Sequence, residues 1–295
     1  MSTLHEPVML PEVVELLAPA RGGLFVDCTV GLGGHARALL DAGASRVVGL
    51  DRDEAALTVA RERLAVFGDR VSLVHADYRE IDRILDEHGI AGVDGALADL
   101  GVSSMQLDAG GRGFSFRRDE PLDMRMDRSR GSTAAELLRD AEETELADVI
   151  FRFGEERYSR RVARAIVGAR RDEPIQTTGR LAAIVRRAVP HRGHQRIDPA
   201  TRTFQALRIW VNRELDGLDA FLQAAGRRLL AHARLAVITF HSLEDRIVKH
   251  TFRAMDKADE GLRILTKRPL TPSDGELARN ARARSAKLRA IERFA

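Results

Sequence analysis

The chain has 295 residues, 44% of them hydrophobic, which is typical of a globular protein with one large domain or two smaller ones. No run of about 18 apolar residues is present, and residues 1–11 lack the basic start and apolar core of a signal peptide, so we expect a cytoplasmic protein without a membrane span. The single cysteine, Cys28, excludes a disulfide framework and a thiolate-rich zinc site. The histidines show no spacing typical of metal ligands, so no metal is expected.

The formal net charge of +3 hides an uneven distribution along the chain. Residues 1–156 carry 17 basic and 30 acidic side chains, a net charge of −13. Residues 157–213 carry 14 arginines and 3 acids, a net of +11, and residues 263–295 carry 9 basic and 3 acidic residues, a net of +6. Two basic segments on an acidic body predict a face for a polyanion, although a general preference for arginine on solvated helices would give the same counts.

The first hundred residues alternate short apolar runs with helical patterns, which is typical of a parallel sheet covered by helices. The pattern predicts the first half of a doubly wound α/β sheet. Its expected strands are 24–28, 46–50, 71–75 and 93–98, and its expected helices are 35–42, 53–67 and 81–88.

The alternation stops after the fourth strand. Residues 101–133 are rich in Gly, Ser, Arg and Asp and predict a loop, and helical patterns follow over 133–189 and 203–230. A strand over 235–240, a helix over 243–255 and two antiparallel strands, 261–266 and 286–293, would complete the sheet. We therefore predict a core made of residues 1–107 and 203–295, interrupted by an all-helical substrate-recognition domain over 108–202.

An aspartate ends each of the first four predicted strands. The carboxyl ends of parallel strands form the rim of the ligand crevice in an open α/β sheet. A single strand-end aspartate is most often a helix cap or a turn former. Four at one rim predict a binding site, and they are Asp27, Asp51, Asp77 and Asp99.

A glycine-rich turn, Gly31-Leu-Gly-Gly-His-Ala36, follows the first strand. It matches the GxGxxA pattern, so a nicotinamide-dependent oxidoreductase is one alternative. S-adenosylmethionine fits better, because its sulfonium and amino groups suit a rim of carboxylates and a dinucleotide's phosphates do not. Asp51 suits the ribose hydroxyls, and Tyr78 would either lie against adenine or be a half-buried surface tyrosine.

Polar side chains also follow the fourth strand, in residues 99–106. Amino methyltransferases typically have here an acidic or amide residue followed by two prolines and an aromatic residue, and those prolines and that aromatic are missing. Asp99 could still accept hydrogen bonds from an incoming amine, with Ser103, Ser104 and Gln106 as further polar groups. The alternative is a polar turn that leads into the insertion.

Residues 239–246 follow the fifth predicted strand and reach the same rim. Ser242 is predicted to cap the next helix, with Asp245 as its capping-box partner. Such a cap would place His241 over the crevice.

Five segments together resemble the MraW/RsmH family of methyltransferases, and the resemblance spans nearly the whole chain. It implies a class I, Rossmann-like methyltransferase core with an inserted helical domain. It also implies methylation of the exocyclic N4 of one cytidine in the decoding region of bacterial small-subunit (16S) ribosomal RNA. The segments are residues 5–9, 27–35, 99–104, 113–116 and 239–246.

The resemblance also implies a set of site residues. The family often has phenylalanine where this chain has Tyr78, and an aromatic wall survives that change. We hypothesise Asp99 as the catalytic acceptor for the N4 hydrogens, with Ser103 and His241 as secondary candidates. The residues implied to contact S-adenosylmethionine are Gly33, Gly34, His35, Asp51, Tyr78, Asp99 and Gln106.

Methylation at a ring carbon would need a cysteine nucleophile, and Cys28, inside the cofactor turn, is better explained as a packed small residue. The expected partner is small-subunit ribosomal RNA, naked or in the assembled subunit, with residues 157–213 and the basic tail as the RNA face and with a homodimer as one oligomeric state. Two alternatives stay open at this point: a non-catalytic RNA-binding ribosome assembly factor and an NAD-dependent oxidoreductase.

Overall fold

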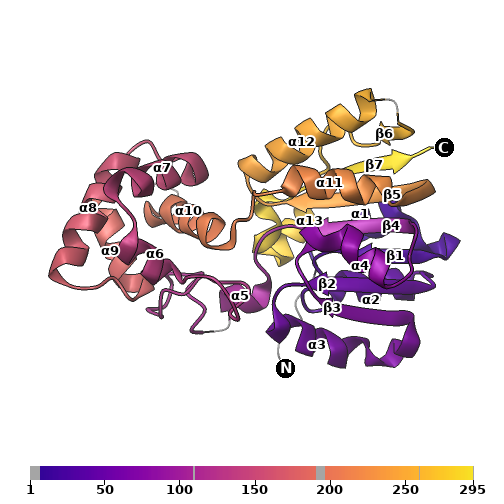
Figure 1. The fold of residues 1–295 in the computed structure, drawn as a ribbon, viewed down its shortest axis with the longest axis horizontal. Coiled ribbons are helices and arrows are strands. Elements are labelled where there is room, and N and C mark those ends of the chain that lie inside the picture. The colour runs from indigo at the N-terminus through magenta and orange to yellow at the C-terminus, as the bar shows by residue number, and fades with distance from the viewer. Residues whose placement is uncertain (1–6, 109, 191–196, 259, 295) are drawn as a thin grey trace. The chain divides into compact units, whose positions relative to one another are not determined.

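The computed structural model describes residues 7–108, 110–190, 197–258 and 260–294. The chain forms two compact units, one of residues 1–101 and 215–295 and one of residues 102–214 (Figure 1). The boundaries expected from the sequence, after residue 107 and before residue 203, both fall inside the second unit. The reason on the carboxyl side is that Phe204 and Leu207 of helix α10 (Ala200–Asn212) are buried in the core of that unit.

A seven-stranded sheet forms the centre of the first unit, in the order β3-β2-β1-β4-β5-β7-β6. Strands β1 to β5 pair in parallel, and β7 is antiparallel to both of its neighbours. The order reverses between β1 and β4, which is where doubly wound sheets bind ligands. The strands are β1 (Leu24–Asp27), β2 (Arg46–Asp51), β3 (Val71–His75), β4 (Val93–Asp99), β5 (Leu229–Thr239), β6 (Leu262–Ile264) and β7 (Lys287–Arg293).

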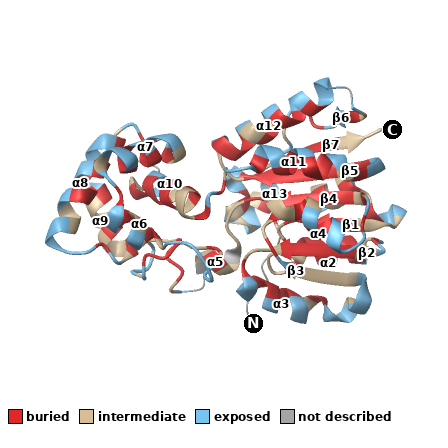
Figure 2. Cartoon of the chain, viewed as in Figure 1, coloured by how far each residue is buried: buried red, intermediate tan, exposed pale blue. Residues whose placement is uncertain are grey.

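Both faces of this sheet are buried. Val26 and Val48 belong to one hydrophobic cluster, and their chain neighbours Phe25 and Val47 belong to another. Because successive strand residues point to opposite faces, the two clusters lie on the two sides of the sheet. Figure 2 shows the buried central strands between helices with exposed outer surfaces, while the edge strand β3 is only partly buried. The helices are α1 (Leu10–Leu17), α2 (Gly34–Asp41), α3 (Glu54–Leu64), α4 (Ile81–Glu87), α11 (Leu218–Arg227), α12 (Ser242–Lys257) and α13 (Asp274–Arg279).

The predicted α/β class and the antiparallel end of the sheet are confirmed. Two predicted details were wrong. Strand β5 begins at Leu229, six residues earlier than expected, because the exposed residues 230–232 interrupt the apolar run that marks a buried strand. The helical pattern over 203–230 is two helices, since α10 ends at Asn212, the cap residue Arg213 has a φ of 50°, and α11 belongs to the other unit.

The second unit is built from helices, and its described residues contain no strand beyond one isolated bridge. Its core includes Leu146 of α7, Ile166 of α8 and Leu181 of α9, all fully buried. No helix in the described parts of the chain combines the length and apolar character needed to cross a membrane. Besides α10, the helices are α5 (Ser104–Asp108), α6 (Ala134–Asp140), α7 (Glu143–Gly154), α8 (Ser159–Asp172) and α9 (Thr178–Ala188).

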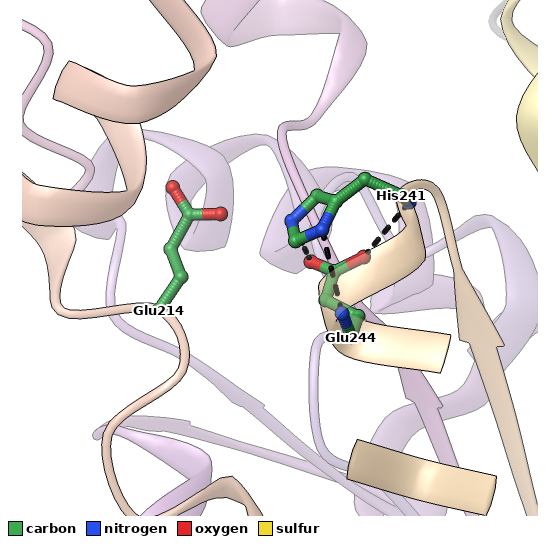
Figure 3. A group of neighbouring side chains, drawn as sticks. All are labelled: Glu214, His241 and Glu244. Atoms are coloured by element: carbon green, nitrogen blue, oxygen red, sulfur yellow. Dashed lines mark hydrogen bonds and ion pairs between the residues drawn. The ribbon is translucent and has the colours of Figure 1, made fainter. Parts of the chain in front are cut away.

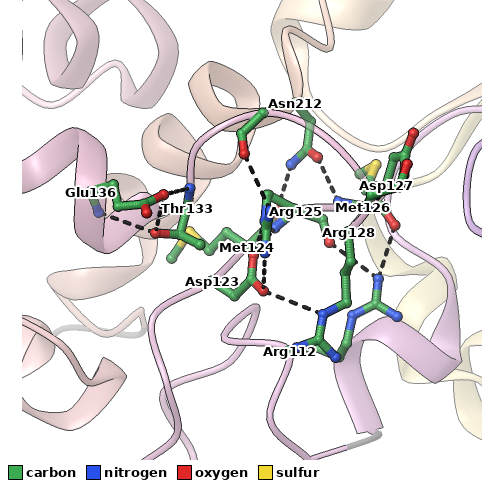
Figure 4. A network of polar contacts seen from close by, with 12 residues as sticks. Arg112, Asp123, Met124, Arg125, Met126, Asp127, Arg128, Thr133, Glu136 and Asn212 are labelled. Carbon is green, nitrogen blue, oxygen red and sulfur yellow. Dashed lines mark hydrogen bonds and ion pairs between the residues drawn. The ribbon is translucent and has the colours of Figure 1, made fainter.

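The predicted loop between α5 and α6 is held by buried polar side chains of the same unit (Figure 4). Asn212, at the end of α10, accepts a hydrogen bond from the Met126 N–H (2.8 Å) and donates one to the Met124 carbonyl (2.7 Å). The buried Arg112 guanidinium donates to the Met126 carbonyl (3.1 Å). The loop backbone is therefore satisfied by side chains where it has no regular secondary structure.

Candidate active site at the carboxyl edge of the sheet

The glycine turn between β1 and α2 is tightly enclosed by its neighbours. Gly33 has a φ of 81°, and a Cβ there would lie 3.0 Å from a methyl group of Leu64. A Cβ on Gly34 would lie only 2.4 Å from the Pro7 ring. Glycine is needed at both positions for these close approaches, and at Gly33 also for its backbone conformation. The turn thus opens helix α2 with its backbone amides near the switch point.

Asp51, at the end of β2, fixes the start of this turn. Its carboxylate accepts hydrogen bonds from the N–H groups of Gly31 and Asp53, both at 2.8 Å. Burial raises the pKa of Asp51. Each carboxylate oxygen has a second lone pair, so Asp51 can also accept the hydrogen bonds from ribose hydroxyls that the sequence predicts.

Asp27, at the end of β1, is 1% exposed. One of its oxygens accepts a hydrogen bond from the Thr29 N–H (3.2 Å), and the other, Oδ2, is buried with no hydrogen-bond partner among the described residues. Burial, and then the charge of Asp51, raise the pKa of Asp27 to about 7. An unpartnered buried carboxylate oxygen is costly, which indicates a place for a cation or a hydrogen-bond donor.

Asp99 ends β4 beside Asp27, across the switch point. Its backbone N–H donates to the Thr29 hydroxyl (2.6 Å), while its buried Oδ1 has no hydrogen-bond partner in the described chain. Burial, followed by the charges of Asp27 and Glu244, raises the pKa of Asp99 well above its usual range. Two neighbouring strands therefore each present an uncompensated carboxyl oxygen.

His35, in the first turn of α2, lies between the N-terminal segment and Asp99. Its Nε2 is 3.0 Å from the Val8 carbonyl oxygen, and its Nδ1 is 3.7 Å from Asp99 Oδ2. Since a carbonyl only accepts, Nε2 carries a hydrogen. Nδ1 faces the Asp99 carboxyl group at a distance too long for a hydrogen bond.

His241 and Glu244 cap helix α12 directly after β5 (Figure 3). The Glu244 N–H donates to His241 Nδ1 (3.4 Å), and the Glu244 carboxylate accepts from the Phe240 N–H (2.9 Å). The predicted cap at Ser242 with Asp245 was wrong by one residue, because the imidazole takes the capping role that a hydroxyl usually has. His241 does lie at the rim, as expected, with Nε2 3.1 Å from Glu244 Oε1.

Tyr78 and Asp77 follow β3, and both make most of their contacts with other residues of the first unit. Tyr78 is 8% exposed, and its ring packs on that of Phe221 at 4.6 Å between centroids. Asp77 is partly buried, which by itself would raise its pKa, but its ion pairs with Arg79 (2.6 Å) and Arg52 (3.7 Å) outweigh this and lower the pKa. Asp77 is therefore already neutralised, unlike Asp27 and Asp99.

Ser103 and Gln106 belong to the second unit, where they cap the short helix α5. The Ser103 N–H donates to Gln106 Oε1 (2.9 Å), and the Gln106 N–H donates to the Ser103 hydroxyl (3.3 Å). Gln106 is 5% exposed. Their predicted roles on the cofactor and the substrate stay predictions.

Sequence reasoning missed two residues of the rim, Thr29 and Glu244. Thr29 binds both Asp27 and Asp99, through its N–H and its hydroxyl. Glu244 is 2% exposed and contributes to the raised pKa of Asp99. The three-residue spacing from His241 to Glu244 was the available signal for Glu244.

A doubly wound sheet with a reversed strand at one end, and with a glycine turn between strand-end carboxylates at the switch point, has the architecture of class I methyltransferases. The chain belongs to the MraW methylase family, which it matches over residues 2–294, so the resemblance seen in the sequence is confirmed.

Three curated relatives share about half of its residues, and each is named Ribosomal RNA small subunit methyltransferase H. The one from Sorangium cellulosum is 54% identical over 98% of this chain and 90% of its own length. The one from Nitrobacter winogradskyi is 53% identical, with the same coverages. The one from Geobacter sulfurreducens is 50% identical over the full length of both chains.

Proposed function

We propose that this enzyme transfers a methyl group from S-adenosylmethionine to the exocyclic N4 of a cytidine in small-subunit ribosomal RNA. Family membership and the names of the relatives support the reaction class and the RNA. The observation that carries the site assignment is the pair of buried, unpartnered oxygens, Asp27 Oδ2 and Asp99 Oδ1, on neighbouring strands.

The residues at the switch point fit a cationic nucleoside. Asp27 would hold its amino group, Asp51 its ribose hydroxyls, and the turn from Gly33 to His35 would lie along its backbone. Tyr78 is mostly buried and would offer adenine only a small part of its surface. When bound, S-adenosylmethionine supplies an electrophilic methyl group on a sulfonium centre. The pyrophosphate of NAD would instead face these uncompensated carboxyl groups, which disfavours the oxidoreductase.

Asp99 is the group we assign to the incoming amine. Cytosine N4 is a poor nucleophile because its lone pair is delocalised into the ring. A carboxylate that accepts a hydrogen bond from the amine raises the electron density on nitrogen. The nitrogen must then lose a proton, and a carboxylate with a raised pKa binds that proton more tightly than an ordinary aspartate does. His241 is a weaker candidate, since its ring caps α12.

The deciding experiment uses small-subunit RNA from a strain that lacks this protein, with methyl-labelled cofactor and mass mapping of the modified cytidine. We expect label on N4 of one cytidine, and a loss of roughly 100-fold in kcat for Asp99→Asn. An assembly factor would bind the RNA without transferring label, and an oxidoreductase would bind NAD in calorimetry; either result would refute the proposal.

The form of the substrate and the assembly state are part of the proposal. Comparing methylation rates of naked RNA and of purified small subunits tests which form is used. Sedimentation of the protein tests the predicted homodimer, and fractionation of cells tests the predicted cytoplasmic location.

A further inference from the structure

A pocket of about 480 Å³ lies at the same edge of the sheet. Strand β5 ends at Thr239 and β7 begins opposite it at Lys287, so the segments beyond both strand ends can line one hollow. Phe240 and Leu277 form apolar parts of its lining, and Ser242 and Ser285 are among the polar parts. All lining residues belong to the first unit.

The pocket adjoins the proposed transfer site. Asp99 of β4 is paired in register with Ile238 of β5, three residues before His241. His241 lines the pocket, and its capping partner Glu244 is close enough to Asp99 to raise the pKa of that carboxyl. Since β5 lies on the opposite side of β4 from β1, the pocket extends away from the glycine turn.

Its charged groups suit a phosphate beside a sugar. Lys287 is held by Asp245 (3.1 Å), whose other oxygen accepts from Arg289 (2.7 Å). Arg284 is exposed and has no hydrogen-bond or ion-pair partner among the described residues. Asp274 is the one carboxylate in the described lining, and it can accept a hydrogen bond from a hydroxyl.

We propose that this pocket binds the ribose-phosphate backbone of the RNA strand next to the methylated cytidine. Arg284 and Lys287 would contact a phosphate, and Asp274 a ribose 2′-hydroxyl. A base that reacts must leave its stack, so the backbone beside it needs to be held. Phosphate contacts fix the register of a nucleic acid, and the 2′-hydroxyl distinguishes RNA from DNA. This inference rests on the proposed function and extends it to the neighbouring nucleotide.

The test compares Arg284→Gln with Arg253→Gln, the same charge change at an exposed arginine of α12 outside the pocket. The probe is a single-stranded, cytidine-containing oligoribonucleotide, read by fluorescence anisotropy at several salt concentrations. We expect Arg284→Gln to weaken binding about three- to ten-fold and to reduce the slope of log affinity against log salt by roughly 0.7. We expect its KM for RNA to rise and its affinity for S-adenosylmethionine to stay unchanged. The Arg253 variant should behave as wild type.

Equal effects of the two variants, or no effect of Arg284→Gln, would overturn the proposal. Asp274→Ala adds a second readout, because it removes the acceptor for the 2′-hydroxyl and should reduce the preference for RNA over the DNA oligomer of the same sequence. If the arginine variant is unstable, Ser285→Trp is the alternative test, because a large side chain at the exposed rim would fill the pocket. It should likewise raise the KM for RNA. Failure of the proposed function would look different: the wild-type protein would not bind S-adenosylmethionine, while the anisotropy comparison would still report on the pocket.

Discussion

Folding buries the Asp27 carboxyl group even when no ligand is bound to balance its charge. Its pKa rises from 3.8 to about 7 in the folded protein. A raised carboxyl pKa means that the folded state binds the proton more tightly than the unfolded state does. The contribution of this proton to the free energy of unfolding is complete below pH 3.8 and is lost as the pH rises to about 7. The difference amounts to roughly 4 kcal/mol.

Asp27→Asn should therefore stabilise the ligand-free protein at pH 8 and change it little near pH 4. Asparagine can still accept the hydrogen bond from the Thr29 N–H but carries no charge to bury. Thermal unfolding at the two pH values measures the effect, and Asp69→Asn, at an exposed position of the same unit, is the matched control. An unchanged or lower midpoint at pH 8 would contradict the burial argument.

The same carboxyl group predicts how cofactor binding depends on pH. A cationic ligand favours ionised Asp27, so binding should release protons below about pH 7 and strengthen by up to about ten-fold per pH unit before levelling off above it. Calorimetry in buffers of different ionisation enthalpy measures the proton release. A flat profile in the wild-type protein, or proton uptake, would exclude Asp27 as the cation's partner, and Asp27→Asn should flatten the profile.

Cys28 separates methylation of the amine from methylation of a ring carbon. It is buried, and burial, followed by the charge of Asp27, raises the pKa of its thiol well above the usual value. Such a thiol does not form the thiolate that ring-carbon chemistry requires. Cys28→Ser should keep methyl transfer within a few-fold of wild type in the labelling assay. Loss of transfer with cofactor binding intact would mean that the chemistry is different.

At the scale of the elements, the order of the strands and the aspartates that end them could be predicted. Buried parallel strands are short apolar runs, and an aspartate after such a run marks the edge where the chain leaves the sheet. The partners of those aspartates could not be predicted. Asp77 is neutralised by Arg52, which comes from another strand end, and the cap of α12 uses an imidazole. Only the Arg52 contact joins segments far apart in the chain; Arg79, which pairs with Asp77, is two residues away, and the α12 cap is local but uses a residue type that the usual capping pattern does not include.

The loop before α6 shows how one helix end orders an irregular segment. Asn212→Leu would leave the Met126 N–H and the Met124 carbonyl without their buried partner, at a cost of about 2–4 kcal/mol. Urea unfolding followed by the fluorescence of Trp210, the single tryptophan and a residue of α10, measures the loss. Asn212→Asp keeps the acceptor for Met126 and should lose less. Equal stability of the leucine variant and the wild type would show that the loop is held by other contacts.

At the scale of the whole molecule, residues 157–213 carry more positive charge than a ligand can contact, because some of the arginines are already paired within the protein. Arg170 donates to the carbonyl groups of Leu138 and Ala141, and Arg186 pairs with Asp198 at 2.7 Å. Several exposed arginines have no partner within the described part of the chain, and they are the better candidates for phosphate contacts. They are Arg160, Arg161, Arg171 and Arg187.

The double variant Arg160→Gln/Arg161→Gln should therefore weaken RNA binding and lower its salt slope by roughly 1.4, if both arginines neutralise single-strand phosphates. Arg186→Gln should change the slope less, because its charge is already balanced by Asp198. Anisotropy titrations over a range of salt concentrations measure both. If the paired arginine has the larger effect, the RNA face has been assigned to the wrong side chains.

The segment that enters α1 is joined to the glycine turn at two points. Pro7 lies against Gly34, and the Val8 carbonyl holds the ring of His35. Just beyond, the Met9 N–H donates to the buried Glu276 of α13 (2.7 Å). Ligand occupancy at the turn should thus slow deuterium uptake in a peptide spanning residues 7–17, which gives a label-free sensor for inhibitor screening.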